Sequence, residues 1–113
     1  MDCIFCNIIK GEIPSSKVYE NEKIYAFNDI SPVAPVHVLI IPKEHIESIN
    51  DLTGENASLV SDVMLAAKEI AVQLGISESG YRVVTNCGQA AGQTVNHIHF
   101  HLLGGRDLAW PPG

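Results

Sequence analysis

Positively charged residues are scarce in this sequence, and long hydrophobic runs are absent. The 113 residues include 7 Lys and Arg against 13 Asp and Glu, which gives a net charge of −6. Binding to a nucleic-acid backbone depends on clustered cations, so we expect no nucleic acid as a partner, although a single nucleotide is not excluded. No apolar run approaches the roughly 18 residues needed to cross a bilayer, so we also expect no membrane partner.

Cysteine is scarce as well, with three residues in all. The N-terminus lacks the basic region and long apolar stretch of a secretory signal, so we expect a cytoplasmic protein without a disulfide framework. Cys3 and Cys6 form a Cys-x2-Cys pair, which needs two more ligands to close a tetrahedral metal site. We expect Cys87 to be a free thiol.

Hydrophobic residues make up 46% of the chain and charged residues 18%, which predicts a single globular domain over residues 1–113. We expect a short helix over residues 3–10, capped by Asp2, and a long helix over 55–74, capped by Thr53, whose apolar stripe extends to Leu74. The expected strands cover residues 17–20, 23–27, 37–41, 81–86 and 95–103, and a helical turn lies within 46–52. The first two strands are short and should form a hairpin with a polar turn at residues 20–23, and the last two should form a hairpin across the segment between them. The strand at 37–41 is apolar enough to be central. The predicted fold class is α+β, with a mainly antiparallel sheet of about five strands.

The most informative stretch is residues 95–103, in which His97, His99 and His101 alternate with apolar residues. A period of two is typical of a strand, so we expect one face of imidazoles and one apolar face. Neighbouring rings would lie roughly 6.5 to 7 Å apart, close enough for two of them to bind one anion or metal ion. Three partly charged rings on one packed face contribute little stability, which favours a functional interpretation.

Two chemistries fit such a row. In the first, neutral imidazoles bind a catalytic zinc with an open fourth position, and His37 and Asp29 supply a further ligand and a general base. In the second, one imidazole attacks phosphorus while its neighbours hold phosphate oxygens. Gly88 and Gly92, in the glycine-rich segment 87–93, favour the second chemistry because they let backbone N–H groups approach an oxyanion, although turn geometry alone also explains them.

Essentially the whole chain resembles the histidine triad family, whose signature His-x-His-x-His-x-x matches residues 97–103. Other similar segments are residues 4–5, 26–32, 34–37, 41–43 and 92–94. The ending Gly104-Gly105-Arg106, followed by residues 110–113, resembles the nucleoside phosphoramidase branch in particular. The nucleotidyltransferase branch has Gln where this chain has His101, and the dinucleoside polyphosphate hydrolase branch lacks this ending.

The resemblance implies a hydrolase that releases a purine nucleoside monophosphate and an amine from a nucleoside 5′-phosphoramidate. His99 would attack the α-phosphorus to form a nucleotidyl-histidine, with its ring oriented by the backbone carbonyl of His97. His101 and His37 would bind phosphate oxygens, Thr94 would help to deliver a proton to the amine, and no catalytic metal would be required. Two alternatives stay open: a nucleotide-binding or interaction module with little turnover, and the zinc-dependent hydrolase.

The resemblance also implies a nucleotide pocket and a homodimer with a shared sheet. Asp29 would hold the ribose hydroxyls, and the tail of one subunit would bring Trp110 to the partner's active site. An apolar group would sandwich the purine, and a polar group would assist at the phosphate. The purine group is Ile4, Phe5, Ile8, Phe27 and Ile30, and the phosphate group is Asn86, Gly92, Gln93 and Thr94. For Phe27 and Ile30 taken alone, an ordinary core role is the favoured interpretation.

A structural zinc is the last implication, because some bacterial members of the family complete the Cys3–Cys6 pair with histidines that match His45 and His97. The alternative is a pair of small, reduced core thiols. If zinc binds, His97 would serve both sites, with its ring as a ligand and its carbonyl orienting the nucleophile. This sequence departs from the family at Thr94, where Ser is usual, and at Asn96, where an aromatic residue is usual.

Overall fold

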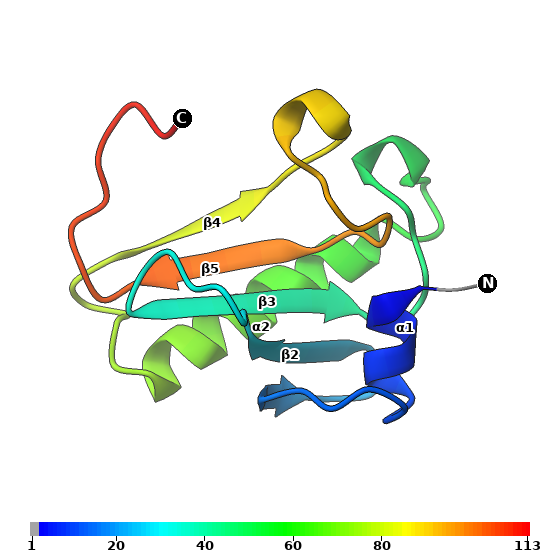
Figure 1. Cartoon of the computed structure of the whole chain (residues 1–113), viewed down its shortest axis with the longest axis horizontal. Helices are drawn as coiled ribbons and strands as arrows, with labels where there is room; N and C mark the ends of the chain where they lie inside the picture. Colours follow the sequence, from blue (N-terminus) through cyan, green and yellow to red (C-terminus); the bar gives the residue numbers. More distant parts are fainter. Residues whose placement is uncertain (1–2) are drawn as a thin grey trace.

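The computed structural model describes residues 3–113 and shows an α+β fold, as predicted (Figure 1). The helices are α1 (Ile4–Ile9) and α2 (Ser58–Gln73), and two short 3₁₀ helices are η1 (Ile49–Asp51) and η2 (Gln89–Ala91). The strands are β1 (Lys17–Glu20), β2 (Ile24–Asn28), β3 (Val36–Pro42), β4 (Tyr81–Thr85) and β5 (Phe100–Gly104). Within the described residues, no helix is long and apolar enough to cross a membrane.

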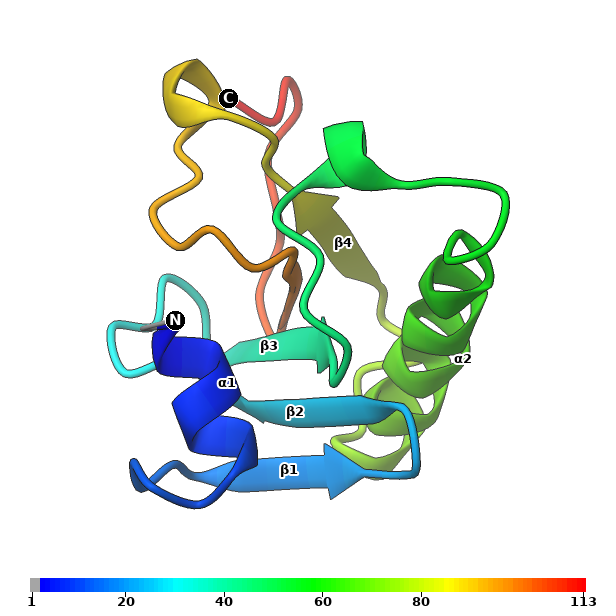
Figure 2. The ribbon, with the colours of Figure 1, turned by 90° about the vertical axis from the view of Figure 1, so that its right-hand side faces the viewer.

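The five strands form one sheet in the order β1-β2-β3-β5-β4, and every neighbouring pair is antiparallel. The strand β3 is central, as its apolar sequence predicts. Its side chains alternate between two core clusters: Val38 and Ile40 belong to one, and Leu39 and Ile41 belong to the other. Figure 2 shows α2 on one side of the sheet and α1 on the other, so each helix covers one of these clusters.

The long helix is shorter than predicted at both ends. Its regular part begins at Ser58, and the Thr53 hydroxyl accepts hydrogen bonds from two backbone N–H groups of the preceding turn, at 3.2 and 3.3 Å. The prediction that Leu74 lies on the buried stripe is wrong, since this side chain is exposed. The chain leaves the helix at Leu74, and the following residue to enter the core is Ile76, whose N–H donates to the carbonyl of Ala71 at 2.9 Å.

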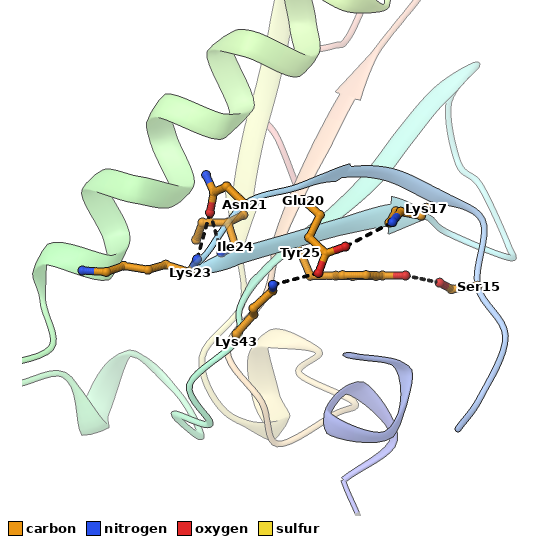
Figure 3. Close-up of polar contacts among 8 residues, drawn as sticks. All are labelled: Ser15, Lys17, Glu20, Asn21, Lys23, Ile24, Tyr25 and Lys43. Atoms are coloured by element: carbon orange, nitrogen blue, oxygen red, sulfur yellow. Dashed lines mark hydrogen bonds and ion pairs between the residues drawn. The ribbon is translucent and has the colours of Figure 1, made fainter. Parts of the chain in front are cut away.

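The predicted hairpin of β1 and β2 is confirmed, and its turn is held by side chains (Figure 3). The amide oxygen of Asn21 accepts two backbone N–H groups of the turn, each at 2.9 Å. The carboxylate of Glu20 accepts hydrogen bonds from Nζ of Lys43 at 2.7 Å and from Nζ of Lys17 at 3.1 Å. These two bonds lower the pKa of the Glu20 carboxyl. The bonds of Asn21 close the turn between β1 and β2, and the Glu20–Lys43 pair joins the end of β1 to the residue that follows β3.

The helix α1 begins at Ile4, and its N-cap is Cys3, whose sulfur accepts the N–H of Cys6 at 3.3 Å. The predicted cap Asp2 lies outside the described residues. The helix places Phe5 and Ile8 against the sheet, where they join the second core cluster. A thiol therefore occupies the capping position, which brings both cysteines to the same end of α1.

The prediction that residues 95–103 form one strand is wrong in its first half, because β5 begins at Phe100. The register pairs Ile40 of β3 with Phe100, so a continued ladder would oppose Ile98 to Pro42. Proline has no N–H to donate, and the ladder stops there. Instead, the N–H of Ile98 donates to the carbonyl of Ile46 at 2.6 Å. The chain before Phe100 is therefore free to turn out of the sheet.

Candidate active site and metal-binding cluster

The three histidines do not form one row. The ring of His97 is completely buried and points toward the N-cap of α1, whereas His99 and His101 are neighbours, with ring centroids 5.2 Å apart. His101 also lies beside His37 of β3, and the centroids of these two rings are 5.2 Å apart. The expected row is thus divided between two sites, and the irregular chain before Phe100 causes the division.

The first site is a cluster of two thiols and two imidazoles. Nδ1 of His97 lies 3.4 Å from the sulfur of Cys3, 3.6 Å from that of Cys6 and 3.2 Å from Nδ1 of His45. The sulfur of Cys6 lies 3.4 Å from Nδ1 of His45. All four ligand atoms lie within 4.8 Å of one another. The structure therefore brings together the four residues that the resemblance to the family implied for a metal site.

The orientation of the His97 ring is set by a backbone group. Nε2 of His97 lies 2.8 Å from the carbonyl oxygen of Pro42, which can only accept, so Nε2 carries the proton. Burial lowers the pKa of His97, which keeps the ring neutral and leaves a lone pair on Nδ1. This lone pair faces the two sulfurs, as a metal ligand requires. The bond to Pro42 has the form of the outer contact that orients ligating histidines in metal sites.

The spacing of the cluster also fits a small divalent ion. A tetrahedron with Zn–N and Zn–S bonds of about 2.0 to 2.3 Å has edges of about 3.3 to 3.8 Å. The contacts of 3.2 to 3.6 Å among the four side chains are close to these edges. Burial and the neighbouring Cys3 raise the pKa of the Cys6 thiol, so without a metal the Cys6 side chain stays protonated. A bound cation would supply the charge that thiolates need.

The second site is centred on His99, which is buried beside Phe5 at a ring-centroid distance of 5.2 Å. Nδ1 of His99 donates to the carbonyl oxygen of His97 at 2.7 Å. In the neutral ring this bond leaves the lone pair on Nε2, and within residues 3–113 no hydrogen bond engages that nitrogen. The ring is therefore prepared to act as a nucleophile or a base through Nε2.

His37 and His101 are joined by a hydrogen bond between Nε2 of His37 and Nδ1 of His101, at 2.9 Å. The N–H of Val33 donates to Nδ1 of His37 at 3.1 Å, so the proton of the neutral His37 ring is on Nε2. A carboxylate oxygen of Asp29 also faces Nε2 of His37 at 3.4 Å, which agrees with a proton there. His101 accepts at Nδ1, and its own proton is therefore on Nε2, free to donate to a ligand.

His101 is neutral at physiological pH. Burial first, and then the neighbouring His99 and His37, lower its pKa to about 4, despite the opposing effect of Asp29. A neutral ring that donates through Nε2 can bind a phosphate oxygen without carrying a charge of its own. The ligand atoms of Asp29, His37 and His101 also lie within 4.8 Å of one another. A metal at this site therefore has a geometric basis, but on a different ligand set from the predicted one, with one triad histidine instead of two and with Asp29 as a ligand in place of a base.

The glycine-rich segment lies between β4 and β5, as predicted, and contains η2. Gly88 and Gly92 both have φ of +89°, a conformation that L side chains rarely adopt, so turn geometry alone requires these glycines. The side chain of Gln93 is engaged within the protein: its oxygen accepts the N–H of Gly88 at 2.9 Å, and its nitrogen donates to the carbonyls of Glu47 and Val95 at 2.7 and 3.1 Å. The side chain of Gln93 therefore orders the segment, and only the backbone of Gln93 is available to bind a ligand.

The predicted purine pocket is divided between core and surface. Phe5, Ile8 and Phe27 are buried in the second core cluster, and the rings of Phe5 and Phe27 meet edge to face at 5.5 Å. Ile30 is 98% exposed and Ile4 is exposed as well. The core interpretation is therefore confirmed for Phe27 and wrong for Ile30. Of the residues expected to sandwich a purine, only the exposed Ile4 and Ile30 are therefore open to a ligand.

A cavity of about 460 Å³ opens between the N-terminal end of α1 and the segment that leads to His97. Its lining combines apolar and polar side chains, namely Cys3, Ile4, His45, Glu47, Thr94, Val95 and Asn96. Two residues expected to contact a nucleotide, Ile4 and Thr94, therefore share one cavity with part of the metal-binding cluster. Asn86 lies half-buried just beyond the last residue of β4.

Trp110 is 80% exposed, so its own chain leaves most of the ring uncovered. Its ring has a guanidinium contact with Arg82 at 5.9 Å from the ring centroid, and Arg82 also donates to the carbonyl of Ala109 at 2.9 Å. These contacts fix the direction of the tail along β4. A large aromatic ring is left open to a second molecule. Cys87 is a free thiol, as predicted.

Several groups that build these sites were missed from the sequence because they are backbone atoms. The carbonyl of Pro42 orients His97, the carbonyl of Ile46 turns the chain before Phe100, and the N–H of Val33 orients His37. Every residue carries such groups, so composition and spacing hold no signal for them. The side-chain bonds of Gln93 were missed for a related reason, since their partners come from distant segments.

The structure thus defines an α+β protein in which a buried imidazole, oriented by a backbone carbonyl, lies beside a second imidazole. The chain belongs to the HIT domain family, whose model matches residues 10–108. It is 48% identical over 107 residues to the purine nucleoside phosphoramidase of Escherichia coli, which covers 95% of this chain and 90% of the relative. It is 53% identical over 112 residues to an uncharacterized HIT-like protein of Synechococcus elongatus, covering 99% of this chain and 97% of the relative.

Solved structures agree with this assignment. The crystal structure of a HIT family hydrolase from Legionella pneumophila superposes with a TM-score of 0.97 at 51% identity, covering 99% of this chain and 100% of the other. A HIT family hydrolase from Clostridium thermocellum superposes with a TM-score of 0.94 at 56% identity, covering 96% and 94%. The resemblance of the sequence to the histidine triad family is thereby confirmed.

Proposed function

We propose that the protein hydrolyses purine nucleoside 5′-phosphoramidates to the nucleoside monophosphate and an amine. The observation that carries this proposal is the hydrogen bond from Nδ1 of His99 to the carbonyl of His97, which leaves Nε2 unprotonated and free. An unprotonated imidazole is nucleophilic near pH 7. The 48% identity to the Escherichia coli purine nucleoside phosphoramidase supports the substrate class.

In the proposed reaction, Nε2 of His99 forms a bond to the α-phosphorus while the bond from phosphorus to nitrogen breaks. The leaving amine takes the proton of the Thr94 hydroxyl. The oxygen of a water molecule then bonds to phosphorus while the bond from phosphorus to Nε2 of His99 breaks, and the water gives one proton back to Thr94. This releases the monophosphate and restores the neutral His99 ring. Nε2–H of His101 donates to a phosphate oxygen, assisted by His37 and by backbone N–H groups around Gly92, and this stabilises the charge that develops at phosphorus.

The remaining nucleotide contacts follow from the same proposal. Asp29 holds the ribose hydroxyls, and its carboxylate is pre-oriented because the N–H of Ser31 donates to Oδ1 at 2.7 Å. The purine lies against Ile4 and Ile30. Asn86 and the backbone of Gln93 contact the phosphate. Trp110 reaches the active site of the partner in a homodimer, which would account for its exposure here.

We also propose a structural zinc ion on Cys3, Cys6, His45 and His97. The convergent lone pair of His97 and the tetrahedral spacing of the four ligand atoms support it. Zinc at this position would tie α1 to the segment that carries His97. The carbonyl of His97 also accepts the hydrogen bond from His99. His97 therefore contributes its ring to the metal site and its backbone to the candidate active site.

The test is release of AMP from adenosine 5′-phosphoramidate by the parent chain and by His99→Ala. We expect the variant to lose at least about 10⁴-fold in kcat, as expected when a nucleophile is removed. Quenched reactions of the parent chain should carry a nucleotide on residue 99. Unchanged turnover in the variant, or a nucleotide on another residue, would remove His99 from this role.

Two alternatives give different results. A zinc-dependent hydrolase that uses Asp29, His37 and His101 as ligands predicts that a chelator abolishes turnover, whereas the phosphoramidase predicts that chelation mainly lowers stability. A nucleotide-binding module predicts that AMP binds while no phosphoramidate is turned over. Titration of AMP binding beside the turnover assay, with and without chelator, separates the three.

A further inference from the structure

The turn that follows β5 is hydrogen-bonded to the loop between β2 and β3 through Arg106, and we call this contact the Arg106 clasp. The guanidinium of Arg106 donates from Nη2 to the carbonyl of Val33 at 3.0 Å and from Nη1 to the carbonyl of Asp107 at 2.9 Å. Gly105, with φ of +89°, lies so close to the loop that a Cβ built on it would be 2.9 Å from Cβ of Pro35. Two bonds from one planar group therefore connect the turn to the loop at a defined distance.

The same Val33 holds the ring of His37. Its N–H donates to Nδ1 at 3.1 Å, while Nε2 of His37 faces two acceptors, Nδ1 of His101 at 2.9 Å and a carboxylate oxygen of Asp29 at 3.4 Å. A neutral imidazole has one N–H. Because Nδ1 of His37 accepts the N–H of Val33, the proton of the ring is on Nε2. The chain of bonds from Val33 then determines that His101 accepts at Nδ1 and donates at Nε2.

We propose that Arg106 is a positioning residue for the candidate active site, which holds Val33 so that His37 and His101 keep the tautomers that present Nε2–H of His101 to a phosphate oxygen. The side chain of Val33 is 61% exposed and adds little packing of its own, so the two backbone hydrogen bonds carry much of its order. The catalytic part of this inference rests on the proposed phosphoramidase function, whereas the tautomer assignment does not.

Without the clasp, Val33 can move away from His37, and a water molecule can donate or accept at Nδ1 equally well. His37 can then place its proton on Nδ1 and accept at Nε2. In that case Nδ1 of His101 must donate, and Nε2 of His101 loses its proton in the neutral ring. A ligand oxygen would then meet a lone pair in place of a donor, which is unfavourable to an anion.

The experiment uses the full-length protein labelled with ¹⁵N and records the tautomers of His37 and His101 from long-range correlations between ring protons and ring nitrogens. Arg106→Ala removes the clasp, and Val33→Pro removes the N–H donor while leaving Arg106 in place. Arg106→Lys keeps one donor to the carbonyl, and Val33→Ala keeps the backbone N–H while it removes the exposed side chain. Circular dichroism and thermal unfolding establish that each variant is folded.

We expect the parent, Arg106→Lys and Val33→Ala to show the Nε2–H form at both rings. Arg106→Ala and Val33→Pro should show mixed forms and should lose roughly tenfold or more in kcat toward adenosine 5′-phosphoramidate, a part of the 10²- to 10³-fold effect of removing one such donor. Parent tautomers in folded Arg106→Ala and Val33→Pro would overturn the proposal, as would a loss in Val33→Ala equal to that in Val33→Pro. If the parent chain has no turnover, the proposed function fails, and the tautomers alone still decide the role of Arg106.

Discussion

Replacing His97 by Ala separates the role of its ring from that of its carbonyl, which orients His99 and is kept in the variant. The ring is completely buried and donates to the carbonyl of Pro42. Leaving that carbonyl without a partner costs about 1 to 3 kcal/mol. The cavity left by a ring smaller than that of Phe adds about 2 kcal/mol. We therefore expect the free energy of unfolding of metal-free protein to fall by about 3 to 5 kcal/mol.

A loss of this size is large for a domain of this length, whose total stability is about 5 to 15 kcal/mol. At about 4 °C per kcal/mol, the melting temperature should fall by about 12 to 20 °C in the presence of a chelator. The matched control is His45→Ala, since His45 is half-buried and, within residues 3–113, its ring is hydrogen-bonded only to Cys6 and His97. We expect the control to lose about 1 kcal/mol in chelator.

The assay is urea unfolding of parent and variants, first with chelator and then with added zinc. Zinc should stabilise the parent by about 2.7 kcal/mol at a free concentration 100 times its dissociation constant. Each variant lacks one ligand and should lose most of this gain. Equal losses for His97→Ala and His45→Ala in chelator would refute the importance of the buried bond to Pro42, and a parent insensitive to zinc would refute the metal site.

Three further predictions concern stability. The pKa of His101 falls from 6.5 to about 4 on folding, so between these pH values the unfolded chain binds more protons than the folded protein. The free energy of unfolding should therefore rise with pH across this range by at most about 3 kcal/mol. Urea unfolding at several pH values should show that His101→Gln lacks this rise. Gly105→Ala should cost about 2 to 3 kcal/mol, since φ is +89° and the new Cβ would lie 2.9 Å from Pro35, whereas Gly54→Ala, with open space around it, should change the melting temperature little. Gln93→Glu replaces the two hydrogen bonds that Gln93 donates to carbonyls by repulsive contacts between a carboxylate and those carbonyls, so the free energy of unfolding should fall by about 2 kcal/mol. Thermal unfolding measures this, and an unchanged melting temperature would contradict the role of Gln93 in ordering the segment 87–93.

Local patterns account for what was predicted well. The apolar run of β3, the polar turn at Asn21 and the apolar stripe of α2 each depend on neighbours along the chain, and the structure confirms all three. The same holds for the antiparallel pairing of β4 and β5 across a glycine-rich segment. The family was also accessible, because the triad signature and the ending at Arg106 are short motifs of unusual composition.

The long-range details were less accessible. Alternation of His97, His99 and His101 predicted one strand with one imidazole face, but the strand ends where Pro42 of a different segment cannot donate a hydrogen bond. The first histidine turns away to the cysteines, and this could not be derived from a period of two. Likewise, the turn residues around Ile30 indicate that the strand of Phe27 ends before it, but only tertiary contacts decide whether the following loop buries its side chain, and Ile30 is 98% exposed.

The order of residues by itself predicted the two helices, four of the five strands, the antiparallel sheet and the histidine triad signature, and the resemblance to the family named the four residues suited to a metal. Tertiary structure alone decided which ring faces which partner. The carbonyls of Pro42 and His97 and the N–H of Val33 choose the nitrogen that carries the proton on each histidine. These backbone groups are the same in every residue, so their effect comes from where the fold places them.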